Sequence, residues 1–90
     1  MSELEITKLC AEAMFDSLEW EQRLFDYNPL HDDAQAMALV KKMQLFIMPE
    51  HEGLAWHVSD KDDHVKYAVG SDSLNRAICE CVANMQRSKP

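Results

Sequence analysis

The sequence predicts a small α+β domain in which helices pack on both faces of a three-stranded antiparallel sheet, in α/β/α layers. Three observations favour this class. Apolar residues recur at helical spacing in three segments, they alternate in short segments between residues 44 and 69, and the two glycines and three prolines stand where the pattern changes. A chain of 90 residues is near the small end of what folds alone. We therefore expect one domain, 1–90, with the order helix, connector, helix, three strands, helix.

The first helix is predicted over residues 3–15. Ser2, with Glu5 three residues later, forms a capping-box pattern at its start. Apolar residues then follow at helical spacing: Ile6, Leu9, Cys10, Ala13 and Met14. A connector is predicted over 16–31, because this stretch is rich in large apolar side chains but has no regular period, and because Pro29 disfavours helix at the residue before it.

The second helix is predicted over residues 32–43. Asp32 stands three residues before Gln35, so we expect Asp32 to cap the helix and Asp33 to place negative charge in its first turn. Adjacent residues on a helix point about 100° apart, so these two carboxylates do not converge on a metal or a substrate. Lys41 and Lys42 fall in the last turn, where positive charge suits the helix dipole.

Three strands are predicted at residues 44–48, 54–59 and 65–69, in an antiparallel meander. Both faces of the first strand are apolar, which indicates a strand covered on two sides. The last helix is predicted over 73–87, with Ser73 as its cap. Its apolar stripe is the most regular in the chain: Leu74, Ala77, Ile78, Cys81, Val82 and Met85.

Three segments together, YNPLHDDAQAMALVKKM, LAWHV and SLNRAICECVANM, resemble the phage ABA sandwich domain of small bacteriophage proteins. The matching pieces are Tyr27, Pro29 and Asp32–Asp33 in the turn that opens a helix, and Leu74 to Ala83 in the last helix. The likeness extends over residues 3–86, although connector 16–26 is longer and more acidic here. The resemblance implies a phage or prophage origin and a layered fold, and it implies no catalytic residues.

The net charge of −7 is concentrated near the N-terminus. Residues 1–36 hold nine acidic residues against Lys8 and Arg23, whereas the remainder is balanced. Such a surface disfavours direct contact with nucleic acid or membrane headgroups and attracts basic protein surfaces. The N-terminus lacks the basic and apolar regions of a signal peptide, and no apolar stretch is long enough to span a bilayer, so we expect the cytoplasm of a bacterial host.

The cysteines and histidines predict no metal site. Cys79 and Cys81 point roughly 200° apart around a helix, so we expect reduced cysteines, with Cys10 and Cys81 packed as small apolar groups. The acidic turn at 59–64 departs from a calcium-binding loop at its sixth and twelfth positions, which are Val65 and Ser71. No histidine pair within one predicted element has zinc-site spacing. The sequence has neither a nucleophile elbow nor a glycine-rich phosphate loop. We therefore expect that the chain is not an enzyme and needs no cofactor.

Aromatic residues among acids in the connector predict a partner-binding surface: Glu19, Trp20, Glu21, Phe25 and Asp26. The first functional hypothesis is a non-enzymatic phage accessory protein that binds a basic host protein and inhibits a defence or nucleic-acid-handling function. The second is a homo-oligomer that binds a small anion, such as a signalling nucleotide, between subunits through Lys41, Lys42, Lys66 and Arg76. The third is a structural or regulatory phage factor without a defence role.

Overall fold

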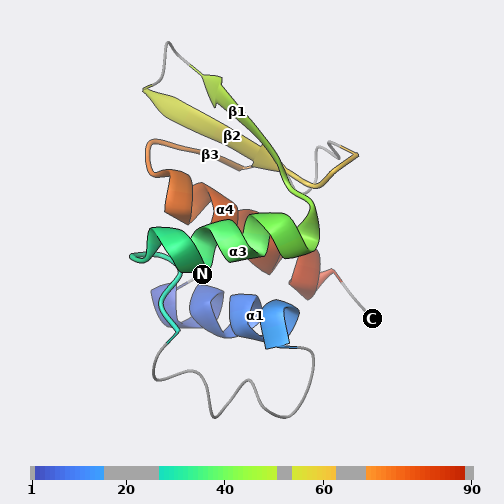
Figure 1. Ribbon diagram of the computed structural model, residues 1–90. Coiled ribbons are helices and arrows are strands. Elements are labelled where there is room, and N and C mark those ends of the chain that lie inside the picture. Colours follow the sequence, from blue (N-terminus) through green and yellow to red (C-terminus); the bar gives the residue numbers. More distant parts are fainter. Residues whose placement is uncertain (1, 16–26, 51–53, 63–68, 89–90) are drawn as a thin grey trace.

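The computed structural model describes residues 2–15, 27–50, 54–62 and 69–88 (Figure 1). The elements follow in this order: α1 (Glu3–Phe15), α3 (Asp33–Met43), β1 (Phe46–Glu50), β2 (Ala55–Ser59), β3 (Val69–Ser71) and α4 (Leu74–Arg87). The predicted α+β class, the element order and the antiparallel sheet are confirmed. The connector at 16–26 and residues 65–68 of the third predicted strand lie outside the described residues.

The sheet has the order β1-β2-β3, and both neighbouring pairs are antiparallel. The first strand begins and ends two residues later than the predicted 44–48. It begins later because Gln44 adopts a left-handed conformation (φ 55°) at the end of α3, and its N–H bonds the carbonyl of Val40. It continues through Pro49 because β1 is an edge strand, where a residue without an N–H is tolerated.

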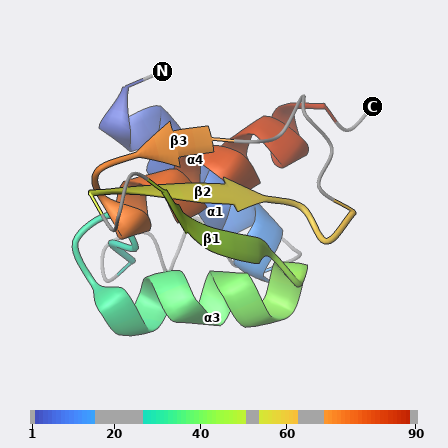
Figure 2. The same ribbon diagram turned by 90° about the horizontal axis from the view of Figure 1, so that it is seen from above.

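The three described helices lie on one side of the sheet, as Figures 1 and 2 show from two directions. Ile47, Val58 and Val69 share the inner face of the sheet, and α4 packs against β2 and β3 on this face. Helix α1 packs against α4 from the other side, and α3 lies beside α4. For the part of the chain that the structure describes, the expectation of helices on both faces is therefore wrong: the layers are sheet, then α4 with α3, then α1.

Helix α4 occupies the central layer, and this explains its burial. Its core residues belong to both sides of the helix, and all are at most 1% exposed: Ala77, Ile78, Cys79, Cys81, Val82 and Ala83. Cys79 meets α1, where the Cys10 thiol donates to its carbonyl oxygen at 3.4 Å. The prediction that Cys10 and Cys81 pack as small buried groups is confirmed, and Cys79 is buried as well. Small side chains at this contact allow the helices to approach closely.

The outer face of the sheet is not covered by any described helix or strand (Figure 2). Phe46 and Met48 point to this face and are 42% and 45% exposed. The sequence pattern of β1, apolar on both faces, indicated a covered strand. The outer apolar residues of β1 instead form part of the surface. The reason is that α4, and not the sheet, takes the central layer and is buried on two sides.

Candidate functional site

Helices α1, α3 and α4 run in the same direction, so their N-terminal ends gather at one end of the molecule (Figure 1). Aligned helix dipoles place partial positive charge at that end and partial negative charge at the other. Acidic residues at the starts of α1 and α3 offset the partial positive charge: Glu3, Glu5 and Asp33. At the other end, Lys42 Nζ donates to the Met14 carbonyl oxygen at 2.7 Å and so satisfies an acceptor in the last turn of α1.

Each helix start is capped by the residue that the sequence predicted. The Ser2 hydroxyl accepts from the Glu5 N–H at 3.2 Å. Asp32 Oδ1 accepts from the Gln35 N–H at 3.0 Å, and the Ser73 hydroxyl accepts from the Arg76 N–H at 3.3 Å. These bonds satisfy backbone donors that have no partner inside the helix. In a capping box, the Gln35 side chain would accept from the N–H of Asp32. Its Oε1 instead accepts from the N–H of Asn28.

Side-chain contacts join the three N-terminal ends. Glu3 of α1 lies 3.4 Å from His31 Nε2, and its other oxygen lies 3.9 Å from Arg76 of α4. Asn75 Nδ2 of α4 donates to Asp33 Oδ1 of α3 at 2.7 Å. The ion-pair side chains are largely exposed, so each contributes little to stability and the contacts chiefly orient the groups.

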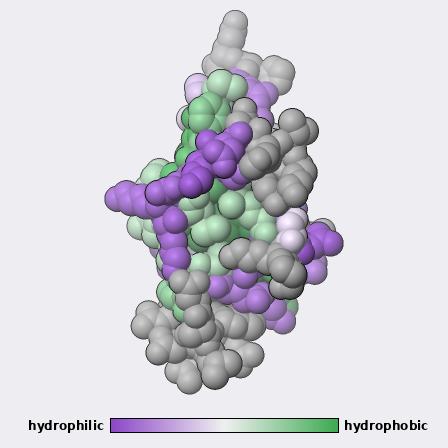
Figure 3. Space-filling view, turned by 90° about the vertical axis from the view of Figure 1, so that its right-hand side faces the viewer, coloured by the Kyte–Doolittle hydropathy of each residue, from purple (hydrophilic) through white to green (hydrophobic). Residues whose placement is uncertain are grey.

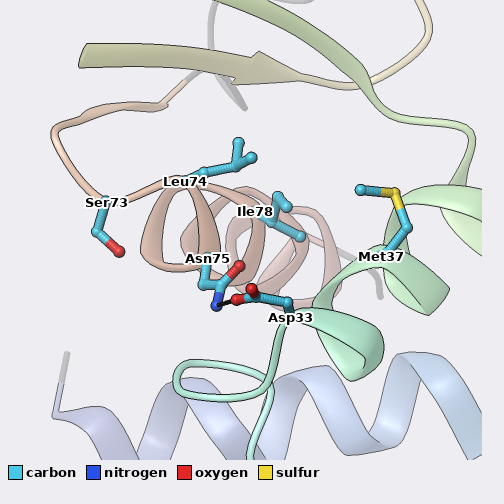
Figure 4. A pocket seen from close by; sticks show the side chains of 6 residues that line it. All are labelled: Asp33, Met37, Ser73, Leu74, Asn75 and Ile78. Carbon is cyan, nitrogen blue, oxygen red and sulfur yellow. Dashed lines mark hydrogen bonds between the residues drawn. The ribbon is translucent and has the colours of Figure 1, made fainter. Parts of the chain in front are cut away.

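Between α3 and α4 at this end lies a groove of about 410 Å³, which we call the α3–α4 groove (Figure 4). Met37, Leu74 and Ile78 supply apolar surface, and Asp33, Ser73 and Asn75 supply polar groups. Met37 projects from α3 toward the groove, while Leu74 and Ile78 project from α4, and the Asp33–Asn75 hydrogen bond lies along one side (Figure 4). The volume is within the usual range of small-ligand sites, roughly 300–1,000 Å³.

The charge around the α3–α4 groove is negative. At the starts of the helices, the described acidic residues outnumber Arg76: Glu3, Glu5, Asp32, Asp33 and Asp72. A negative end of this kind attracts cations and repels phosphates. An occupant with an apolar stem and a cationic head fits this arrangement, since Met37, Leu74 and Ile78 suit the stem and the Asp33 carboxylate suits the head.

The predicted anion-binding residues do not form one cluster among the described residues. Lys41 and Lys42 are in the last turn of α3, whereas Arg76 is in the first turn of α4, at the other end of the helix layer. Arg76 is also engaged by Glu3 and by Glu80, whose Oε2 lies 3.4 Å from its Nε. Lys66 lies outside the described residues, as does the whole predicted partner-binding surface: Glu19, Trp20, Glu21, Phe25 and Asp26.

The end opposite the groove has a different character. Figure 3 looks at the side where the helices end and shows apolar residues gathered in the middle, with hydrophilic residues around them. The last turns of the helices contribute partly buried methionines, Met14, Met43 and Met85, and the basic residues Lys41, Lys42 and Arg87. Among the described residues of these last turns, the three basic residues outnumber Glu12, so the two ends of the helix layer differ in charge.

Sequence reasoning missed the α3–α4 groove. Its residues come from segments about 40 positions apart, such as Asp33 and Asn75, and no local pattern shows that their helices start side by side. A partial signal was present, because acids precede or open all three predicted helices. Among the described residues, no three His, Cys, Asp or Glu side chains are placed to hold a metal ion. In the same part of the chain, no helix has the length and apolar content needed to cross a membrane.

Comparison with known proteins adds no relative. Neither the protein-family models, nor the curated proteins, nor the solved structures yield a match to this chain. The likeness to the phage ABA sandwich domain stays a prediction from the sequence.

Proposed function

We propose that this chain is a non-enzymatic protein-binding domain that receives a Lys or Arg side chain of a basic partner in the α3–α4 groove. The observation that carries the proposal is the combination of three apolar residues with the Asp33 carboxylate in one groove. Lys and Arg place an apolar stem along such surface and keep the charged head at its polar side. A hydrogen-bonded ion pair with Asp33 would then fix the head.

The charge of the chain supports the same partner class. The net charge is −7, and the described acids at the starts of the helices add local negative potential around the groove. Electrostatic attraction of this kind raises the association rate of a basic partner, and the rate falls as salt is added. Binding through the groove is therefore expected to be strongly salt-dependent.

The biological setting we propose is that of a phage or prophage accessory protein acting on a host protein in the bacterial cytoplasm. Proteins that handle nucleic acid carry basic surfaces for phosphate contacts. An acidic domain that occupies such a surface would compete with nucleic acid, as an inhibitor of defence or nucleic-acid metabolism does. The alternative of a nucleotide-binding oligomer has less support, because Arg76 is paired with Glu3 and Glu80 and the groove beside it is acidic.

The first test uses a defined probe, a short synthetic peptide with alternating Lys and Leu, and a matched peptide with Glu in place of Lys. The chain is titrated with each peptide and followed by two-dimensional amide NMR. We expect the Lys peptide to shift the amides of Met37, Asn75 and Ile78 and to leave Lys41 unchanged. The Glu peptide should have no effect, and added salt should weaken the Lys peptide.

Asp33→Asn supplies the decisive variant, because its amide oxygen can still accept from Asn75 while the negative charge is lost. Asp33 is exposed, and an exposed ion pair contributes about 0.2–1 kcal/mol, so we expect peptide affinity to fall by up to about 5-fold. Asp62→Asn is the matched control, since it removes the same charge from an exposed turn outside the groove. Equal loss in both variants, or peptide shifts confined to other surfaces, would refute the proposed function.

A host partner is tested with the same pair of variants. Candidates captured by the wild-type chain should be lost with Asp33→Asn, kept with Asp62→Asn, and displaced by added nucleic acid. A partner that binds both variants equally would not be using the groove.

A further inference from the structure

The hydrogen bond between Asn75 and Asp33 decides which polar atoms the α3–α4 groove offers to a ligand. Asn75 Nδ2 donates to Asp33 Oδ1 at 2.7 Å, and the bond lies along one side of the groove (Figure 4). A carboxylate only accepts hydrogen bonds, so the amide turns its nitrogen toward Asp33 and its oxygen away. No donor from the described residues reaches the other two oxygens, Asp33 Oδ2 and Asn75 Oδ1. The polar side of the groove therefore carries two adjacent acceptors and suits a ligand that brings donors.

Arg76, the next residue of α4, does not occupy these acceptors. Its Nη1 lies 3.9 Å from Glu3 Oε2, and its Nε lies 3.4 Å from Glu80 Oε2. Neither of these glutamates lines the groove. The two acceptors are therefore left for a cation that comes from outside the chain.

The fold holds the two acceptors in place. Asp33 opens α3, Asn75 lies in the first turn of α4, and these two helices pack against each other. A hydrogen bond that a carboxylate accepts is stronger than one between neutral groups, so the pair keeps its geometry before a partner arrives. A site that is already ordered loses less free energy when it binds.

Lysine and arginine make different demands on a carboxylate. The guanidinium of arginine is a planar fork whose donors match both oxygens of one carboxylate in two parallel bonds. The ammonium of lysine is compact, and its three donors point in different directions toward single acceptors. Because Asn75 already bonds Asp33 Oδ1, a guanidinium fork has to share that oxygen with Asn75 or displace it. An ammonium needs only Asp33 Oδ2 and Asn75 Oδ1.

We propose that the α3–α4 groove selects lysine over arginine and that Asn75 determines this preference. The preference rests on the proposed function, because it concerns which of the two basic side chains that groove takes. The nitrogen of Asn75 occupies one carboxylate oxygen of Asp33, which removes the site for a fork. The oxygen of Asn75 supplies the second acceptor for the ammonium. The four-carbon stem of the lysine then lies along the apolar residues Met37, Leu74 and Ile78.

Two matched peptides test the preference. The alternating Lys and Leu peptide is compared with a peptide that has Arg in place of every Lys, so that length and charge are equal. Both peptides are titrated into the full chain, and the amide NMR shifts of Met37 and Ile78 give the two dissociation constants. Polar contacts at an exposed site contribute modestly, so we expect the Lys peptide to bind about 2- to 5-fold tighter than the Arg peptide.

Asn75→Ala is the variant that separates the two side chains. The fork can then use both oxygens of Asp33, and the ammonium loses its second acceptor. We expect the Arg peptide to bind this variant at least as tightly as the Lys peptide does. Asn84→Ala, the same substitution on α4 but outside the groove, is the matched control and should keep the wild-type ratio. Alanine is a good helix former, so both variants should fold, which a thermal melt followed by circular dichroism would check.

Selection of lysine is refuted if both peptides shift the groove amides and the Arg peptide binds the wild-type chain as tightly as the Lys peptide. Asn75 does not set the preference if Asn75→Ala keeps the wild-type ratio, or if Asn84→Ala loses it to the same extent. In each of these cases the groove still binds a basic side chain, so the proposed function stands. If neither peptide shifts the groove amides, the proposed function itself fails, and selection of lysine fails with it.

Discussion

Asp32 and Asp33 are adjacent in sequence, yet the structure assigns them separate tasks that substitution can distinguish. Asp32 Oδ1 accepts from the Gln35 N–H at 3.0 Å, whereas Asp33 Oδ1 accepts from Asn75 at 2.7 Å and borders the α3–α4 groove. Asp32→Ala should therefore lower the free energy of unfolding by the larger amount, while Asp33→Asn should lower partner affinity and cost only about 0.5 kcal/mol of stability, from the loss of one charge in the first turn of α3.

The expected cost of Asp32→Ala follows from two contributions. Loss of an N-cap bond costs about 0.5–2 kcal/mol, typically about 1. Loss of negative charge at a helix N-terminus costs a further 0.3–1 kcal/mol or so. Together they give about 1.5 kcal/mol for Asp32→Ala. Asp32→Asn keeps a side-chain acceptor and loses only the charge, so it should cost about 0.5 kcal/mol.

The assay is urea unfolding followed by far-UV circular dichroism. A small domain has an m-value of about 1 kcal/mol/M, so Asp32→Ala should move the midpoint by roughly 1 to 1.5 M without changing the slope. Asp62→Ala, in an exposed turn, is the control and should stay within about 0.5 kcal/mol of wild type. Asp32 is not the cap of α3 if Asp32→Ala behaves like this control, or if Asp32→Asn is as costly as Asp32→Ala.

Two further predictions concern buried ionisable groups. The Tyr27 hydroxyl is buried without a hydrogen-bond partner among the described residues, and burial raises the pKa of Tyr27 above its usual range. Tyr27→Phe should leave stability unchanged or increase it by about 1 kcal/mol in urea unfolding; a clear loss would reveal a partner for the hydroxyl. Burial, with a smaller contribution from Asp60, raises the pKa of Cys81 to about 12. The unfolded chain then loses this thiol proton first, so the contribution of Cys81 to stability should be constant below about pH 8.5 and fall as pH rises toward 12, by at most about 1.4 kcal/mol per pH unit. Cys81→Ala should reduce that alkaline slope, and an unchanged slope would assign it to other groups.

The sequence by itself determined where the helices begin. Ser2, Asp32 and Ser73 were predicted as caps, and each accepts a backbone hydrogen bond three residues ahead. Such signals succeed because the donor and the acceptor are close in the chain, so no tertiary contact is needed to bring them together. The three-strand meander was predictable for a similar reason, since alternation and turn residues are local.

The tertiary structure alone decided which surfaces are covered. The apolar stripe of α4 predicted one buried side, but Cys79 and Ala83 are buried as well, because α1 packs on the side away from the sheet. The same choice leaves Phe46 and Met48 in solvent on the outer face. Periodicity shows that a face is apolar, but whether it meets a helix of its own chain depends on how distant segments share the available partners.

The α3–α4 groove is also a feature that only the tertiary structure decided. Asp33 and Asn75 meet only because α3 and α4 start at the same end of the molecule, and the direction of a helix is set by connections and packing that no local pattern encodes. The sequence supplied acids at the helix starts for their own dipoles. The parallel packing of the helices gathered those acids around one apolar groove, and thereby turned three local stabilising features into one negatively charged surface.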